Sequence, residues 1–179
     1  MPKVDLIVFV GPSLCSRMPE PLPEEIWLPP AAQGDVLRAA MKYQPKKILL
    51  VDGTYYQTLS VWVKEIVYAL LEGITVIGAS SIGAIRAAEL WRYGMIGIGE
   101  IFERYSDGEE DDSLVVLNYD PETFRPLTTP RVGNEAKARD ALAAIDFARS
   151  FTGKIVTSLN KEAITPFLSV VIDRILEDG

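Results

Sequence analysis

Hydrophobic positions over the first two thirds of the chain fall into two alternating patterns. Short, nearly continuous apolar runs, typical of strands buried on both faces of a sheet, occur at Lys3–Val10, Lys47–Asp52 and Ile74–Gly78. Between and after them lie stretches with helical periodicity, which predict helices at 35–43, 59–71 and 82–93. This alternation predicts an α/β fold, a three-layer Rossmann-like arrangement with a mostly parallel sheet flanked by helices.

The pattern loosens after Gly94, and the elements there are less regular. The sequence predicts a short helix, a further strand, an alanine-rich helix and a last helix with Thr165 as N-cap and Pro166 at its first position. The first three of these cover 97–105, 113–119 and 134–151. Because hydrophobicity is lowest near 121–133, we expect an α/β core over residues 1–120 and a helical C-terminal part over 121–179 packed on it.

Composition narrows the functional classes. The chain has 179 residues, 48% of them hydrophobic, which suits one globular domain and excludes a disordered chain. Its net charge of −7 and the lack of a basic run argue against nucleic-acid binding. No apolar stretch is long enough for a membrane span, and we expect no signal peptide.

Histidine is absent, and there is one cysteine, Cys15. No mechanism can therefore use an imidazole base or a histidine metal ligand, and neither an internal disulfide nor a zinc cluster can form. The acidic run Glu109–Asp112 favours a solvated loop over a Mg²⁺ site, so we expect no metal and no cofactor. A single cysteine favours a reducing compartment, which predicts a cytoplasmic location.

Candidate chemistry lies where the predicted strands end. Ligands of open parallel sheets bind outside the carboxyl ends of the strands. Three loops meet this condition: Gly11-Pro12-Ser13, Asp52-Gly53-Thr54, and the turn from Ala79 to Gly83.

The third loop, Ala-Ser-Ser-Ile-Gly, resembles the nucleophile elbow of hydrolases. Its spacing places Ser81 at the nucleophile position, with Ala79 in place of the first glycine. Backbone N–H groups at Ile82 and Gly83, together with the Gly11–Ser13 loop, would then hold an oxyanion. Two other readings stay open: Ser80 or Ser81 caps the helix, or the helix start binds an anion.

A serine nucleophile needs a base, and lysine is the natural substitute for histidine. Lys64 lies in an otherwise apolar helix and is our candidate base, with Asp52 as the carboxylate that orients it or replaces it. The alternatives are that Lys64 extends to solvent and that Asp52 forms a turn before Gly53. Arg86, on the following helix, is a candidate substrate-binding residue, although an ion pair with Glu89 at i, i+3 is the default explanation for it.

Several segments in order resemble one family. FVGPSL, PPAAQGDVLRA, VDGTYYQTLSVWVKEI, GASSIGAIRAAEL and YGMIGIGEIFERYSDGEEDD together are similar to the TfuA-like core domain over roughly residues 4–120. Family members often carry His where this chain has Val63, directly before Lys64. A histidine base therefore cannot be essential here, which leaves Lys64 or Asp52.

The resemblance implies a function in peptide-backbone thioamidation. TfuA-like proteins act beside a YcaO enzyme and hydrolyse the C-terminal thiocarboxylate of a ThiS-like sulfur carrier, which releases sulfide. It implies Ser81 or Ser80 as nucleophile, Lys64 and Asp52 as base or orienting group, and Gly11, Ser13, Gly53, Ile82, Gly83 and Arg86 around the substrate.

Two other function classes stay open at this point. The chain could be a non-catalytic adaptor of the YcaO enzyme that uses the serine turn only as a helix cap, or a generic Ser/Lys hydrolase without a sulfur role. Through its acidic loop and charged C-terminal region, we expect an electrostatic contact with the carrier or the YcaO enzyme. The sequence leaves open whether the chain forms a homo-oligomer.

Overall fold

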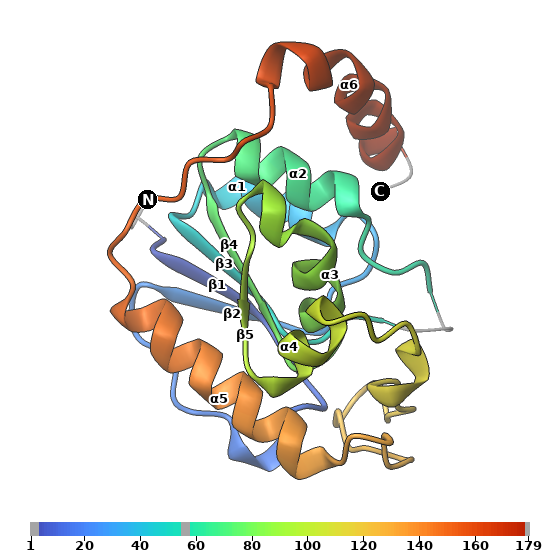
Figure 1. Cartoon of the computed structure of the whole chain (residues 1–179). Helices are drawn as coiled ribbons and strands as arrows, with labels where there is room; N and C mark the ends of the chain where they lie inside the picture. Colours follow the sequence, from blue (N-terminus) through green and yellow to red (C-terminus); the bar gives the residue numbers. More distant parts are fainter. Residues whose placement is uncertain (1–3, 55–57, 178–179) are drawn as a thin grey trace.

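Five strands form one all-parallel sheet in the order β2-β1-β3-β4-β5 (Figure 1). The computed structural model describes residues 4–54 and 58–177. The strands are β1 (Leu6–Phe9), β2 (Glu25–Leu28), β3 (Lys47–Leu50), β4 (Thr75–Ala79) and β5 (Ile96–Ile98).

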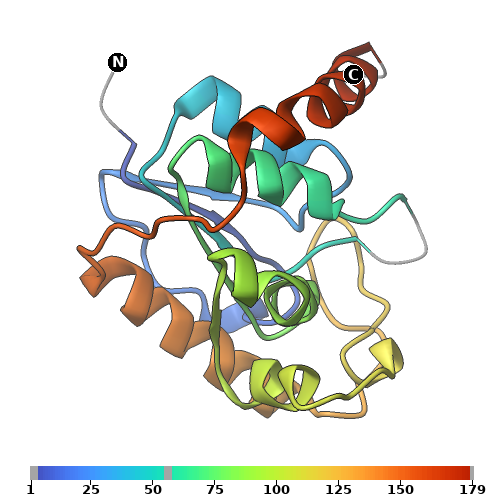
Figure 2. The ribbon, with the colours of Figure 1, turned by 45° about the horizontal axis from the view of Figure 1, so that its top comes forward.

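Helices cover both faces of this sheet, and the α/β, three-layer Rossmann-like expectation is confirmed (Figure 2). One face carries α1, α2 and α3, and the other carries α5; α4 follows the edge strand β5, and α6 lies outside α1 and α2. The helices are α1 (Asp35–Tyr43), α2 (Val63–Leu71), α3 (Ile82–Leu90), α4 (Glu100–Ser106), α5 (Asn134–Ser150) and α6 (Lys161–Glu177).

The continuous apolar runs are explained by this double cover. In β1, Ile7 and Phe9 pack toward α1, α2 and α3, whereas Leu6 and Val8 pack toward α5. Because both faces are covered, polar residues at alternate positions would be buried without partners. On α5, the side that meets the sheet is formed by small residues that allow close packing: Ala138, Ala141, Ala144 and Ala148.

The local predictions hold for most of the α/β part, with exceptions at β2, at β5 and at Ser113–Tyr119. Lys3, the first residue of the first predicted strand, lies outside the described residues. The short strands β2 and β5 were not predicted, since each has only three or four residues beside Pro or Gly. A strand over Ser113–Tyr119 is wrong: a 3-10 turn at Asp112–Leu114 is followed by irregular backbone with alternate residues buried.

The start of the last helix is also wrong. Helix α6 begins at Lys161, so Pro166 lies inside it rather than at its first position. Asn160 Oδ1 accepts a hydrogen bond from Ala163 N and thereby starts the helix more than a turn before Thr165. The division into residues 1–120 and 121–179 stays a prediction, although α5 supplies the whole helical layer on one sheet face.

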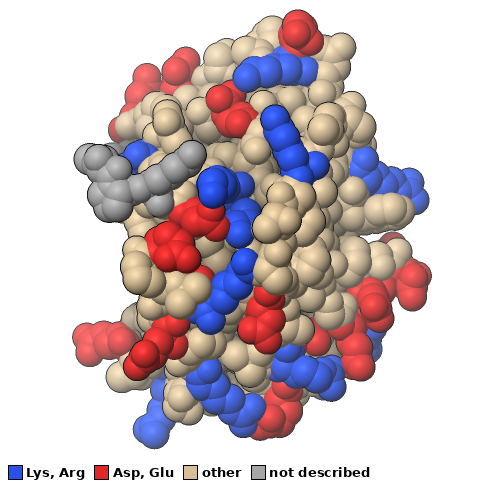
Figure 3. Space-filling view, turned by 90° about the vertical axis from the view of Figure 1, so that its left-hand side faces the viewer, with Lys and Arg blue, Asp and Glu red and all other residues tan. Residues whose placement is uncertain are grey.

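Charges of both signs are interspersed on the face shown in Figure 3. The surface of the molecule carries ion pairs such as Lys46 with Asp5 and Arg17 with Glu135. Surface pairs of this kind contribute little to stability. The face in Figure 3 shows no extended patch of one sign. Among the helices that the structure describes, none has the length and apolar character needed to cross a bilayer.

Candidate functional site

The loops after β1, β3 and β4 meet at one edge of the sheet. The strand order reverses between β1 and β3, since the chain passes from β1 outward to β2 and then returns to β3. A crevice at such a reversal is where open α/β sheets bind their ligands. The three loops predicted from the sequence are therefore brought together at the expected place.

Asp52 joins the first two loops. One carboxylate oxygen, Oδ2, accepts hydrogen bonds from the backbone N–H groups of Gly11 and Ser13, both at 2.9 Å. The other, Oδ1, accepts the Ser13 hydroxyl at 2.6 Å. The side chain is 1% exposed, so these contacts replace water for a buried carboxylate. Because they donate to Asp52, the N–H groups of Gly11 and Ser13 are not free to hold an oxyanion.

Ser80 occupies the strained position of the turn between β4 and α3. Its φ is +68°, a left-handed conformation that non-glycine residues rarely adopt and that often marks functional turns. Its Oγ lies 3.0 Å from Ser13 Oγ and 2.9 Å from the carbonyl oxygen of Lys137. Ser80, Ser13 and Asp52 thus form one buried chain of hydroxyl and carboxylate groups.

Ser81 stands at the N-cap position of α3, but its hydroxyl caps nothing. No hydrogen bond runs from the helix backbone to its side chain. Its Oγ instead lies 3.2 Å from Nζ of Lys137 on α5, and the residue is only 5% exposed. A serine hydroxyl beside a buried amine is the arrangement of a serine nucleophile with a lysine base.

Lys137 is the member of this buried cluster that the sequence analysis missed. Its side chain is almost fully buried, and Nζ also donates to the carbonyl oxygen of Val115 at 2.9 Å. Burial lowers the pKa of the Lys137 amine, and the nearby Asp52 carboxylate opposes that shift. The available signal was its spacing: Lys137 shares the stripe of Ala141, Ala144 and Ala148, which faces the sheet.

The structure places Lys64 away from this cluster. It is exposed on α2, and its Nζ lies 6.0 Å from the ring centroid of Trp62. Arg86 donates to the carbonyl oxygen of Val61 and to the carboxylate of Glu89, so its contacts tie α3 to the loop before α2. Neither side chain makes a hydrogen bond to the serines.

Glycines allow the tight packing of the serine turn. A Cβ at Gly83 would collide with the carbonyl group of Leu50, and one at Gly78 would collide with the carbonyl group of Gly83. Gly53 has the same role beneath Ile82, because a Cβ at Gly53 would collide with the Ile82 side chain. The N–H of Gly83 donates to the carbonyl oxygen of Val51 at 3.3 Å.

At the start of α3, the N–H of Ile82 donates to no acceptor among the described residues. In a nucleophile elbow, the residue that follows the nucleophile supplies one oxyanion donor from its backbone. If Ser81 is the nucleophile, Ile82 holds that position, where the positive end of the helix dipole adds to the effect.

The acidic loop near Glu109–Asp112 is occupied by ion pairs. Asp111 contacts Arg131 at 2.5 Å, and Glu109 lies 3.9 Å from Arg104. Within the described part of the chain, no group of three or more Asp, Glu, Cys or His residues is arranged to hold a metal ion.

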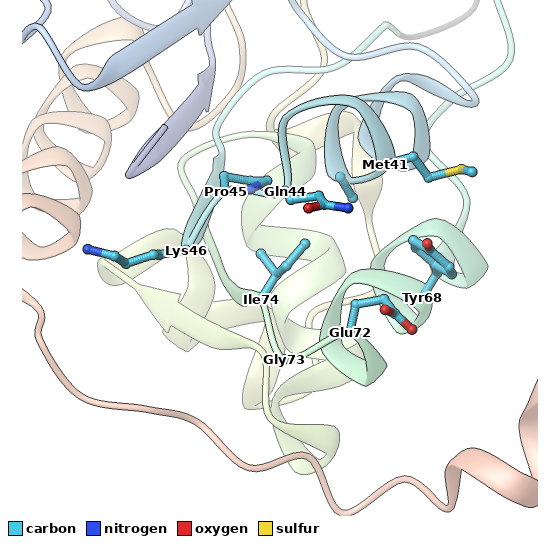
Figure 4. Close-up of a pocket in the computed structure, with 9 residues that line it drawn as sticks. Met41, Gln44, Pro45, Lys46, Tyr68, Glu72, Gly73 and Ile74 are labelled. Atoms are coloured by element: carbon cyan, nitrogen blue, oxygen red, sulfur yellow. The ribbon is translucent and has the colours of Figure 1, made fainter. Parts of the chain in front are cut away.

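A hollow of about 520 Å³ lies at the opposite edge of the sheet, between the ends of α1 and α2 (Figure 4). It is lined by Met41, Gln44, Lys46, Tyr68 and Glu72, among others. Lys46 and Glu72 are engaged with Asp5 and Lys161 respectively. This hollow therefore lacks the buried polar groups that distinguish the serine cluster.

Comparison with known proteins gives one family. The TfuA-like protein family matches residues 52–164, more than half of the chain, which include Asp52, both serines and Lys137. No curated protein matches the sequence.

Proposed function

Because the chain belongs to the TfuA-like family, we propose that it hydrolyses the C-terminal thiocarboxylate of a ThiS-like sulfur carrier and supplies the sulfide to a YcaO enzyme for peptide-backbone thioamidation. The observation that carries this proposal is the 3.2 Å contact between Ser81 Oγ and Lys137 Nζ, both buried at the carboxyl edge of the sheet. This pair provides a nucleophile and a base for acyl transfer without histidine.

In the first half of the reaction, the neutral amine of Lys137 takes the proton of the Ser81 hydroxyl as Oγ attacks the thiocarboxylate carbon. The carbonyl oxygen gains negative charge, which the N–H of Ile82 stabilises. When the tetrahedral intermediate collapses, the carbon–sulfur bond breaks and the Lys137 ammonium returns its proton to sulfur. Hydrosulfide leaves, and the carrier tail is held as an ester on Ser81.

In the second half, Lys137 takes a proton from water, whose oxygen attacks the ester carbon. Collapse breaks the bond to Ser81 Oγ, which regains its proton from Lys137, and the carrier leaves with an ordinary carboxylate. One water is consumed and one hydrosulfide and one proton are released for each thiocarboxylate. Lys137 acts twice as base and twice as acid, and the lowering of its pKa by burial favours the neutral amine that starts each half.

Ser80, Ser13 and Asp52 position the reacting pair in this proposal. Ser80 contacts the backbone carbonyl of Lys137 at 2.9 Å and therefore links α5 to the serine turn. Asp52 holds the Gly11–Ser13 loop through three hydrogen bonds and places a negative charge where Lys137 becomes an ammonium ion. The charge offsets part of the cost of protonating a buried amine.

The test is sulfide release from a purified thiocarboxylated carrier, followed together with the loss of sulfur in the carrier's intact mass. Ser81→Ala should abolish release, while Ser80→Ala should retain a measurable rate, because Ser80 does not form the ester in this scheme. A mass increase on Ser81 equal to the dehydrated carrier would identify the ester. Undiminished release by both variants would overturn the serine mechanism. No release by the unchanged protein would favour the adaptor function, and hydrolysis of simple esters at a comparable rate would favour a generic hydrolase.

A further inference from the structure

The serine–lysine cluster is closed to solvent in this structure. Ser80 is 0% exposed, and Ser81 and Lys137 are 5% and 1% exposed. A carrier tail must bring its terminal carbon to Ser81 Oγ, and no substrate can do so while the cluster is covered. Some part of the cover has to move.

The cover includes the hairpin Asn118–Thr128, which folds over the Gly11–Ser13 loop. If Gly11 carried a Cβ, that atom would lie 3.2 Å from the ring of Phe124 and closer still to Pro30. Tyr119, at the base of the hairpin, is buried, and its pKa is raised by burial and by the Asp52 carboxylate, which places its hydroxyl in the field of the site. Figure 2 shows this segment, in yellow to tan, at the edge where the strands end.

The hairpin is hydrogen-bonded to itself alone, within the residues that the structure describes. Asp120 N donates to Arg125 O, and Leu127 N donates to Asn118 O. The Asp120 carboxylate accepts from N–H groups at positions 122 and 123 inside the same loop. Across residues 4–54 and 58–177, the hydrogen bonds of residues 118–128 all stay within the hairpin, and its contact with the Gly11–Ser13 loop is made by the Phe124 side chain.

Phe124 has a strained backbone conformation, and a hollow lies beside its ring. Its φ is +56°, a left-handed conformation that is unusual and strained for a bulky residue. Beside its ring lies an apolar hollow of about 280 Å³, lined also by Val10, Met18, Trp27 and Pro29. The ring can therefore leave Gly11 and still contact an apolar surface.

From these observations we infer that the hairpin Asn118–Thr128 is a gate over the serine cluster and that Phe124 is the residue that closes it. The hairpin moves as a unit because its hydrogen bonds are internal. Opening it uncovers the Gly11–Ser13 loop, the side from which a carrier tail would reach Ser81. That a substrate must reach the cluster rests on the proposed function, whereas the test of the gate does not use hydrolysis.

The test measures access to position 81 without any hydrolysis. In a Cys15→Ser background, which removes the one native cysteine, Ser81→Cys gives a single thiol inside the site. Its modification by methyl methanethiosulfonate is followed by intact mass. We expect slow modification with the native hairpin and an increase of at least about tenfold with Phe124→Ala, since loss of the ring favours local opening.

Two further variants distinguish the loss of the Phe124 ring from a general disturbance of the fold. Phe124→Asn removes the ring but suits the left-handed backbone, so it should accelerate modification even if Phe124→Ala disturbs the hairpin. Leu127→Ala, on an exposed side chain of the same hairpin, is the matched control and should change the rate less than about twofold. Circular dichroism and thermal unfolding confirm that each variant is folded.

Equal modification rates in the parent, Phe124→Ala and Phe124→Asn proteins would overturn the gate, as would native-hairpin modification as fast as that of an unfolded control. The outcome is independent of the proposed function. If Ser81→Ala still released sulfide while Phe124→Ala accelerated modification, the gate would stand and the serine mechanism would fall. If Ser81→Ala abolished sulfide release and Phe124→Ala did not accelerate modification, the mechanism would stand and the gate would fall.

Discussion

A cluster of polar side chains is buried at the carboxyl ends of the strands, whereas the charged side chains around the hollow at the amino ends are exposed. At the carboxyl edge, Ser13, Asp52, Ser80, Ser81 and Lys137 are buried and contact one another or nearby backbone groups. At the amino edge, a hollow of about 520 Å³ is open to water, and its charged side chains form exposed pairs (Figure 4). The hollow at the amino edge has room for a ligand, but the closed serine cluster offers the better grounds for a catalytic role.

The difference follows from desolvation. Taking an amine out of water disfavours its charged form, so burial can turn a lysine into a base that is neutral near physiological pH. In the open hollow, water screens each charge and competes for each hydrogen bond. The size of a cavity therefore indicates where a ligand fits, whereas buried polar groups indicate where a proton can be moved.

In the comparison of the buried lysine with the exposed Lys64, the largest expected effect on sulfide release comes from Lys137→Met. This change keeps the apolar stem but removes the amine, so sulfide release should fall on the order of 10²–10⁴-fold, the contribution usual for a general base. The matched control is Lys64→Met on α2, where the lysine is exposed above Trp62. Its rate should stay within about twofold of the unchanged protein, because no contact links it to the serines.

The reverse result would contradict this comparison of the buried and the exposed lysine. If Lys64→Met lost activity and Lys137→Met kept it, the base expected from the sequence would be correct and the buried lysine would be structural. Thermal unfolding should accompany the rates, because a protein that merely loses its fold would lose activity for another reason.

A smaller effect concerns pH. Burial lowers the pKa of Lys137, and only the neutral amine can act as base, so kcat/KM should rise with pH through that lowered pKa and then level off. The inflection should lie below about 10.4, the ordinary value for lysine. Asp52→Asn removes the negative charge that favours the ammonium form and should therefore move the inflection to lower pH.

The measurement is kcat/KM for sulfide release over the stable pH range for both proteins. An inflection that moved to higher pH in Asp52→Asn would contradict the assignment of Lys137, since loss of a neighbouring negative charge cannot raise the pKa of an amine. An unmoved inflection would mean that another group titrates. The Lys137→Met protein should show no inflection of this kind in its residual rate.

Part of this site could be predicted from the sequence, and the physical reason is topological. Asp52, Ser80 and Ser81 directly follow strands, and the carboxyl ends of parallel strands meet at one edge, so the alternation of elements places them together. Lys137 could not be found in this way. It lies 56 residues beyond Ser81 on a helix whose position depends on which sheet face is left uncovered.

Lys64 and Lys137 also show why helical periodicity alone did not find the buried lysine. Lys64 lies among larger apolar residues, which favoured a buried position, but in α2 Lys64 is exposed and Val67, Tyr68 and Leu71 are only half-buried. Lys137 lies among alanines, which gave α5 little hydrophobic contrast between its sides. Small side chains are what bring α5 close enough to the sheet for the lysine to reach Ser81.

The smallest expected effect is at the amino edge. Glu72→Gln removes the charge that pairs with Lys161 at 2.8 Å, and both side chains are about half exposed. Such pairs contribute roughly 0.2–1 kcal/mol, so the free energy of unfolding should fall by no more than that, and less at high salt. Sulfide release should be unchanged, because this hollow lies at the sheet edge opposite the serines. Denaturant unfolding at low and high salt, together with the sulfide assay, checks both statements. A loss of activity of tenfold or more in a protein of undiminished stability would show that the open hollow takes part in the function, and the contrast between the two edges would then have to be abandoned.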